Sequence, residues 1–146
     1  MKTFAGGLLT LVLFTALAAP AVAQETPSLD LGGFIKKTHL HQIAGGTTVA
    51  LAVATGAAAL LGWDGHPLLG YATLGAGAAT LSLGLTAYSD RLPEVWPHAL
   101  LMGLAETGWA LNAFVLEPGS LPHKVTGALS IASLAGAIVA IVLING

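Results

Sequence analysis

The chain has 146 residues, of which 55% are hydrophobic and only 8% are charged. Soluble domains carry roughly 25% charged residues, so these numbers exclude an ordinary soluble domain with a charged surface and predict a surface that mostly faces lipid. Five Lys and Arg residues against seven Asp and Glu exclude a basic surface for nucleic acid, and the lack of cysteine excludes disulfides and thiolate metal sites.

The first 23 residues have the pattern of a secretory signal peptide. A single early Lys precedes an apolar stretch, and Ala-Val-Ala at 21–23 forms a cleavage site, so we expect cleavage after Ala23. An uncleaved membrane anchor is the alternative interpretation. Cleavage predicts a protein of the bacterial inner membrane whose mature N-terminus is periplasmic. Residues 24–38 are polar and contain Gly and Pro, which predicts a short periplasmic lead-in.

Four apolar segments follow, and each approaches the roughly 20 residues that a transmembrane helix needs: 41–62, 67–88, 97–116 and 124–144. The linkers between them are rich in Gly, Pro, Asp and Ser, as turns are. Pro67 and Pro97 lie where helices are expected to begin, a position at which the missing amide hydrogen costs little. The pattern predicts an all-α fold, an integral membrane four-helix bundle of up-down topology over residues 39–146.

The histidines reveal an internal repeat. His41 and His66 are 25 residues apart, and so are His98 and His123. A shift of 57 residues therefore lays one predicted hairpin, about 41–88, on the other, about 98–144, without a gap. We interpret the chain as two copies of one hairpin, related by an axis along the membrane normal.

The up-down topology predicts where these four histidines lie. His41 and His98 begin alternate helices and share the periplasmic side, whereas His66 and His123 share the cytoplasmic side. In a square bundle, alternate helices face each other diagonally across the core. Two facing imidazoles are what bis-histidine ligation of a haem iron requires, and ionisable residues inside membranes mark functional sites. The sequence therefore predicts two haem sites, one near each membrane face.

A glycine four residues after three of the histidines supports this interpretation. Residues four apart lie on the same helix face, so each glycine is expected to leave room for a macrocycle beside its histidine. The three motifs are HQIAG, HPLLG and HKVTG, which place the glycines at Gly45, Gly70 and Gly127.

This pattern resembles the cytochrome b561 family, on the strength of the four histidines and the three H-x-x-x-G motifs. The resemblance covers residues 39–146 and implies two b-type haems and transmembrane electron transfer, between a quinone and a periplasmic electron-transfer protein. Arg91 and Lys124 are placed to pair with haem propionates or, equally, to anchor helix ends at lipid headgroups. The chain departs from the family in having four predicted helices where many members have six. It also lacks residues that resemble the eukaryotic ascorbate site, and its oligomeric state is not predicted.

Two positions leave alternatives open. His39 is a second candidate ligand beside His41, which we favour because it has the glycine and the spacing of 25. Glu106 is the one acidic residue deep inside a predicted span, where an unpaired carboxylate is expensive. It is either a proton or quinone site, or a carboxyl that is hydrogen-bonded to Ser or Thr of a neighbouring helix.

A different class of function also fits the composition. In that alternative, the protein is a non-haem structural or accessory subunit of a larger membrane complex, and its histidines only cap helices. No nucleophile elbow, phosphate-binding loop or zinc-protease motif is present in the sequence, so no catalytic residues are predicted.

Overall fold

The computed structural model describes residues 30–145, so the predicted signal peptide and residues 24–29 of the lead-in lie outside the described residues. Every regular element in this part of the chain is helical, as the sequence predicts. In chain order the elements are α2 (Leu31–Lys37), α3 (Leu40–Leu60), α4 (His66–Ala87), the 3-10 turn η1 (Ser89–Arg91), α5 (Leu92–Phe114) and α6 (Leu121–Asn145).

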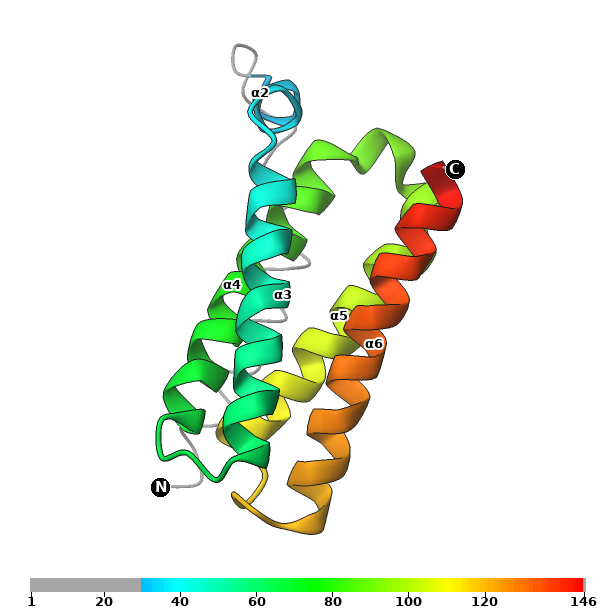
Figure 1. The fold of residues 1–146 in the computed structure, drawn as a ribbon. Helices are drawn as coiled ribbons and strands as arrows, with labels where there is room; N and C mark the ends of the chain where they lie inside the picture. Colours follow the sequence, from blue (N-terminus) through cyan, green and yellow to red (C-terminus); the bar gives the residue numbers. More distant parts are fainter. Residues whose placement is uncertain (1–29, 146) are drawn as a thin grey trace.

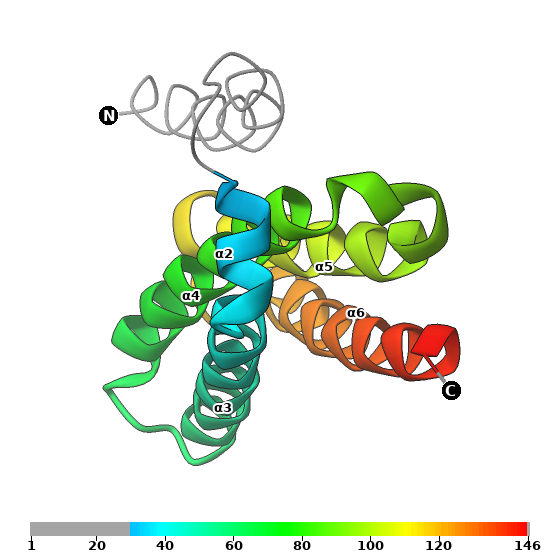
Figure 2. The ribbon, with the colours of Figure 1, turned by 90° about the horizontal axis from the view of Figure 1, so that it is seen from above.

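The four long helices form two hairpins that lie side by side. α3 packs along α4, α5 packs along α6, and the hairpins meet through α4 and α5 (Figure 1). Viewed along the helices, α3 and α6 diverge from this seam (Figure 2). A groove of about 420 Å³ lies between α3 and α6, and its lining is almost wholly apolar.

The molecule has two ends, which we name by what lies there. The α2 end holds α2, the connection between α4 and α5, and the C-terminus of α6 (top of Figure 1). The loop end holds the connections 61–65 and 115–120. The N-termini of α3 and α5 lie at the α2 end, and those of α4 and α6 lie at the loop end, as an up-down order requires.

The predicted lead-in contains a short helix, α2, at whose start Asp30 accepts a hydrogen bond from the Gly33 amide at 2.7 Å. The predicted start of the third span was wrong. α5 begins at Leu92, ahead of the predicted span, and Pro97 lies inside the helix. Pro93 occupies the first turn instead, where a missing amide hydrogen is harmless, and Glu94 lies there near the positive end of the helix dipole.

Three of the four long helices, α3, α4 and α6, are long and apolar enough to cross a membrane. The 23-residue α5 is long enough but is not among them. Its polar residues, including Glu94, His98, Glu106 and Asn112, lower its mean hydropathy below that of the other three. The sequence predicted four equivalent membrane spans, whereas α5 is less apolar than the other three long helices.

Small polar side chains hold the first hairpin together. The hydroxyls of Thr48 and Thr80 lie 2.9 Å apart and those of Thr55 and Thr73 2.8 Å apart, so each pair shares a hydrogen bond between α3 and α4. Thr48 and Thr73 are fully buried. Small residues at such an interface let helix backbones approach closely, and this approach fixes the histidines that begin the helices.

Candidate functional site

The structure brings the four histidines together as two pairs. At the α2 end, the ring centres of His41 and His98 lie 6.2 Å apart with their planes at 85°. At the loop end, the ring centres of His66 and His123 lie 6.1 Å apart with their planes at 80°. Each pair joins one helix of the first hairpin to the corresponding helix of the second.

The separation within each pair has a chemical meaning. An imidazole nitrogen binds a first-row metal at about 2.0–2.1 Å and its ring centre lies about 1.1 Å behind, so two imidazoles on opposite sides of one metal have ring centres about 6.3 Å apart. Both observed separations fall close to this value.

Three of the four imidazoles are oriented through Nδ1. His41 Nδ1 lies 3.0 Å from the backbone carbonyl of Thr80, and His98 Nδ1 lies 2.8 Å from that of Ala137. His66 Nδ1 lies 3.2 Å from the carbonyl of Thr55. A carbonyl oxygen only accepts, so Nδ1 carries the hydrogen and donates it, which leaves Nε2 unprotonated and able to bind a metal.

These hydrogen bonds follow the internal repeat. The carbonyl that accepts from His41 lies 39 residues further along the chain, and the carbonyl that accepts from His98 also lies 39 residues further. The two hairpins therefore support their α2-end histidines by the same contact, although Thr80 and Ala137 have different side chains. The repeat predicted from sequence extends to the groups that orient the rings.

The loop end breaks this symmetry. His123 Nδ1 is buried and has no hydrogen-bond partner in the described part of the chain. Asn112 is the position equivalent to Thr55 in the second hairpin. Its Oδ1 is buried and has no hydrogen-bond partner in the described part of the chain either. The Asn112 amide instead packs against Gly127, where an added methyl carbon would lie 3.1 Å from Nδ2.

A large cavity opens at the α2 end. Its volume is about 990 Å³, and all four long helices line it, with His41 and His98 both among the lining residues. Pockets of about 300–1,000 Å³ hold drug-sized ligands, so this one has room for a large flat molecule between the imidazoles. Arg91 and Tyr88 line its rim, and Val49 and Leu134 connect it with the apolar groove between α3 and α6.

Glycines line this cavity, and one of them escaped the sequence analysis. Gly45 lines it as expected, but so does Gly84, where an added methyl carbon would lie 2.7 Å from His41 Cε1. Gly84 thus makes room for the ring of His41. At the loop end, an added methyl at Gly70 would meet nothing within 4 Å, and Gly127 faces Asn112. No local motif marks Gly84, because its partner is 43 residues earlier in the chain.

His39 does not join a pair. It is exposed, it has left-handed backbone angles at the start of α3, and its Nδ1 lies 2.9 Å from Gln42 Oε1. Of the two candidates in the HLH sequence, the structure places His41 beside His98.

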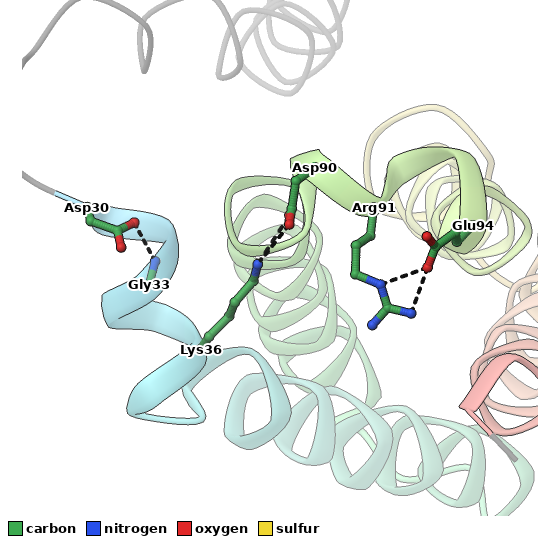
Figure 3. Close-up of polar contacts among 6 residues, drawn as sticks. All are labelled: Asp30, Gly33, Lys36, Asp90, Arg91 and Glu94. Carbon is green, nitrogen blue, oxygen red and sulfur yellow. Dashed lines mark hydrogen bonds and ion pairs between the residues drawn. The ribbon is translucent and has the colours of Figure 1, made fainter.

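Two of the three cations near the α2 end, Lys36 and Arg91, are paired with carboxylates (Figure 3). The Arg91 guanidinium lies 2.8 Å from the Glu94 carboxylate. The Lys36 ammonium lies 3.1 Å from the Asp90 carboxylate, and this ion pair joins α2 to η1. Lys36 also lies 5.3 Å from the ring centre of Tyr88. Hydrogen bonding to Lys36 lowers the pKa of the Asp90 carboxyl below its ordinary value. At the other end, Lys124 is exposed on α6 beside His123.

Glu106 is buried in the middle of α5, with 8% of its surface exposed. Its carboxyl packs on Gly77 of α4, where any side chain would overlap it. Neither carboxyl oxygen has a hydrogen-bond partner among residues 30–145. The alternative in which a neighbouring Ser or Thr satisfies this carboxyl was therefore wrong.

Residues 30–145 contain no group of three or more histidines and carboxylates that would hold a bare metal ion. The chain matches no known family model, and neither a curated protein nor a solved structure shows a match. What the two histidine pairs do is therefore inferred from their own geometry.

Proposed function

We propose that this protein is a membrane b-type cytochrome that carries electrons across the bilayer through two bis-histidine haems. His41 and His98 hold one haem at the α2 end, and His66 and His123 hold the other at the loop end. The observation that carries the proposal is the separation of about 6 Å between the ring centres in both pairs, which is the separation of two imidazoles on one iron.

The donor set fits a haem better than a bare ion. Each pair offers two neutral imidazoles and no third ligand among the described residues, and a porphyrin supplies the four equatorial nitrogens that the chain lacks. The Nδ1 hydrogen bonds of His41 and His98 fix the ring orientation, as the outer-shell partners of metal-bound histidines do. The cavity between them supplies the space.

When bound, a haem with both axial positions occupied by imidazole supplies one-electron transfer and leaves no open position for substrate chemistry. The chain sets the redox potential through ligand orientation, burial and nearby charge. Arg91 lines the rim of the α2-end cavity, where it is placed to face the anionic propionates.

The two pairs lie at different depths of the proposed membrane bundle. His41 begins α3, and the carbonyl that orients His66 belongs to Thr55, which is 14 residues later on the same helix. At 1.5 Å per residue the two levels are about 21 Å apart, within a hydrocarbon core of about 30 Å. Electrons that pass from one pair to the other therefore cross most of the bilayer.

The surrounding membrane arrangement belongs to the same proposal. α5 completes a four-helix bundle with α3, α4 and α6, with His98 and Glu106 facing the bundle interior and Glu94 exposed in the first turn. The protein lies in the bacterial inner membrane with the α2 end on the periplasmic side. A quinone and a periplasmic electron-transfer protein are the partners that such an arrangement serves.

The proposal is tested on protein expressed with ample haem and purified in detergent. We expect a reduced-minus-oxidised absorbance spectrum with sharp α and Soret bands, and about two haems per chain in a pyridine haemochrome assay. A folded but colourless protein would overturn the proposal and favour the structural or accessory role.

A further inference from the structure

Glu106 occupies a position that electron transfer alone does not explain. It lies eight residues after His98 and six residues before Asn112, which are about 12 Å and 9 Å along α5. It is therefore near the middle of the path between the two histidine pairs. Its carboxyl is almost fully buried and has no hydrogen-bond partner in the described chain.

The residues around Glu106 leave space for its carboxyl group but provide no cation or hydrogen-bond donor to it in the described chain. Gly77 leaves space on α4 that any side chain would fill. The other titratable side chains of the four long helices lie in their first turns or the turn that follows: His41 in α3, His66 and Tyr71 in α4, Glu94 and His98 in α5, and His123 and Lys124 in α6. No cation faces Glu106 from the middle of any helix.

The repeat sets the surroundings of this carboxyl apart from the equivalent place in the fold. The position equivalent to Glu106 in the first hairpin is Val49, and the position equivalent to Gly77 in the second is Leu134. Both side chains are apolar and line the groove between α3 and α6. Of the two equivalent places, only the seam between α4 and α5 therefore holds a carboxyl.

We infer that Glu106 is a proton-binding site coupled to the electrons that the histidine pairs carry, an inference that rests on the proposed function. When an external one-electron donor reduces a site, the Glu106 carboxylate takes one proton from a hydronium ion of the bulk solvent. A carboxyl O–H bond forms, a hydronium O–H bond breaks and water remains; when the electron leaves, the carboxyl returns the proton to water. The added negative charge is thereby balanced in a part of the described core that holds no cation.

The α2-end cavity provides the approach for this proton. Met102 and Thr80 both line the cavity, and they lie about one helical turn from Glu106 and Gly77 respectively. The Thr80 hydroxyl itself is engaged with that of Thr48 on α3 and does not hydrogen-bond to Glu106. Water that enters the cavity needs to cross only this turn.

The test is a spectroscopic redox titration of the purified haem protein over a range of pH, with Glu106→Gln compared with the wild type. Coulomb's law at about 12 Å and an effective dielectric constant of about 20 gives about a tenfold change in proton affinity per electron. That change corresponds to a total fall of about 59 mV in midpoint potential as the pH rises. We expect Glu106→Gln to lose this fall.

A matched control is Glu117→Gln, which changes the same chemical group at an exposed loop position and should keep the wild-type pH dependence. Glu106→Leu, which places an apolar side chain in an apolar core, serves if the Gln variant does not fold. A reduced-minus-oxidised infrared spectrum should show a protonated carboxyl band that both Glu106 variants lack.

The inference is overturned if either Glu106 variant retains the wild-type pH dependence, or if the wild type shows none. Haem content is measured on each sample, so a preparation without haem contradicts the proposed function and is told apart from a haem protein that does not bind this proton.

Discussion

The two ends of the molecule hold their histidines at nearly the same separation but support them differently. At the α2 end both imidazoles donate to backbone carbonyls, and a cavity of about 990 Å³ lies between the helices. At the loop end His66 Nδ1 donates to the Thr55 carbonyl, whereas His123 Nδ1 has no hydrogen-bond partner in the described chain. The two ends therefore share the separation between the paired rings but differ in the groups that hydrogen-bond to Nδ1.

This difference separates two features of a histidine pair: the distance between its rings, and the hydrogen bonds that orient each ring. The spacing within a pair depends on helix packing that both hairpins share. Ring orientation depends on single outer-shell contacts, and losing one of these typically costs 10–100-fold in metal affinity. Under the proposed function, two haem sites that are alike in their ligands would differ in affinity and potential, and electrons would occupy them in a preferred order.

The largest expected effect is the loss of one haem at a chosen end. His98→Ala removes one of two axial ligands at the α2 end, so the purified variant should contain about one haem per chain. His123→Ala should do the same at the loop end, and the two residual spectra should differ. The pyridine haemochrome assay measures both.

His39→Ala is the control for these substitutions, since His39 is exposed and hydrogen-bonds only Gln42. It should retain two haems. Loss of a haem in this variant, with His41→Ala retaining both, would reverse the assignment at the α2 end.

The second effect compares the affinities of the two ends directly. His123→Ala leaves only the α2-end site and His98→Ala leaves only the loop-end site, so a haem titration of each apoprotein isolates one site. We expect the α2-end site to bind about tenfold or more tightly, because both of its imidazoles are oriented by carbonyls. Equal affinities would mean that the unpaired His123 Nδ1 has no consequence.

The third effect concerns Gly84. In Gly84→Ala the new methyl meets the His41 ring, which must move away from the Thr80 carbonyl. We expect about a tenfold loss of haem affinity at the α2 end, read in the His123→Ala background, and no change at the loop end.

Gly75→Ala is the matched control on the same helix, because an added methyl there meets nothing within 4 Å. It should leave haem affinity unchanged and, since alanine favours helix, leave stability equal or slightly higher. The Gly84 prediction fails if both variants bind haem equally well.

The smallest effect is confined to the surface of the α2 end. The pKa of Asp90 is lowered in the folded protein by its hydrogen bond to Lys36, so the pair stabilises the fold above the ordinary aspartate pKa of about 3.9. That stabilisation is lost as the pH falls through the lowered pKa that Asp90 has in the folded protein.

Thermal unfolding of Asp90→Asn against the wild type checks this. The wild type should be slightly more stable near neutral pH, with the difference vanishing in strong acid. Asp64→Asn, at an exposed aspartate of the loop end, should show no such pH-dependent difference. A constant difference for Asp90→Asn at all pH values would contradict the assignment.

Much of this arrangement could be predicted from sequence, because it depends on periodic features. Apolar segment lengths predicted the long helices, the spacing of 25 predicted the repeat, and the up-down order predicted which histidines share an end. The start of α5 was misplaced because two prolines, Pro93 and Pro97, both resemble helix starts, and only packing decides between them.

The contacts that orient the rings could not be predicted in the same way. Gly84 and the carbonyls of Thr80 and Ala137 act on residues about 40 positions away, and no local motif marks such a contact. The repeat relates the two carbonyl contacts to each other, but the sequence marks neither of them, since a backbone carbonyl carries no side-chain signal. Glu106 was singled out by its charge, but its place opposite Gly77 depends on how α4 meets α5.

Electron paramagnetic resonance of the purified ferric protein tests the central claim most directly, since it reports the axial ligands of each iron. Two bis-histidine sites predict low-spin ferric signals that account for about two irons per chain, one of which disappears in His98→Ala and the other in His123→Ala. High-spin iron in the wild type, or low-spin signals that survive both substitutions together, would contradict ligation by these two pairs.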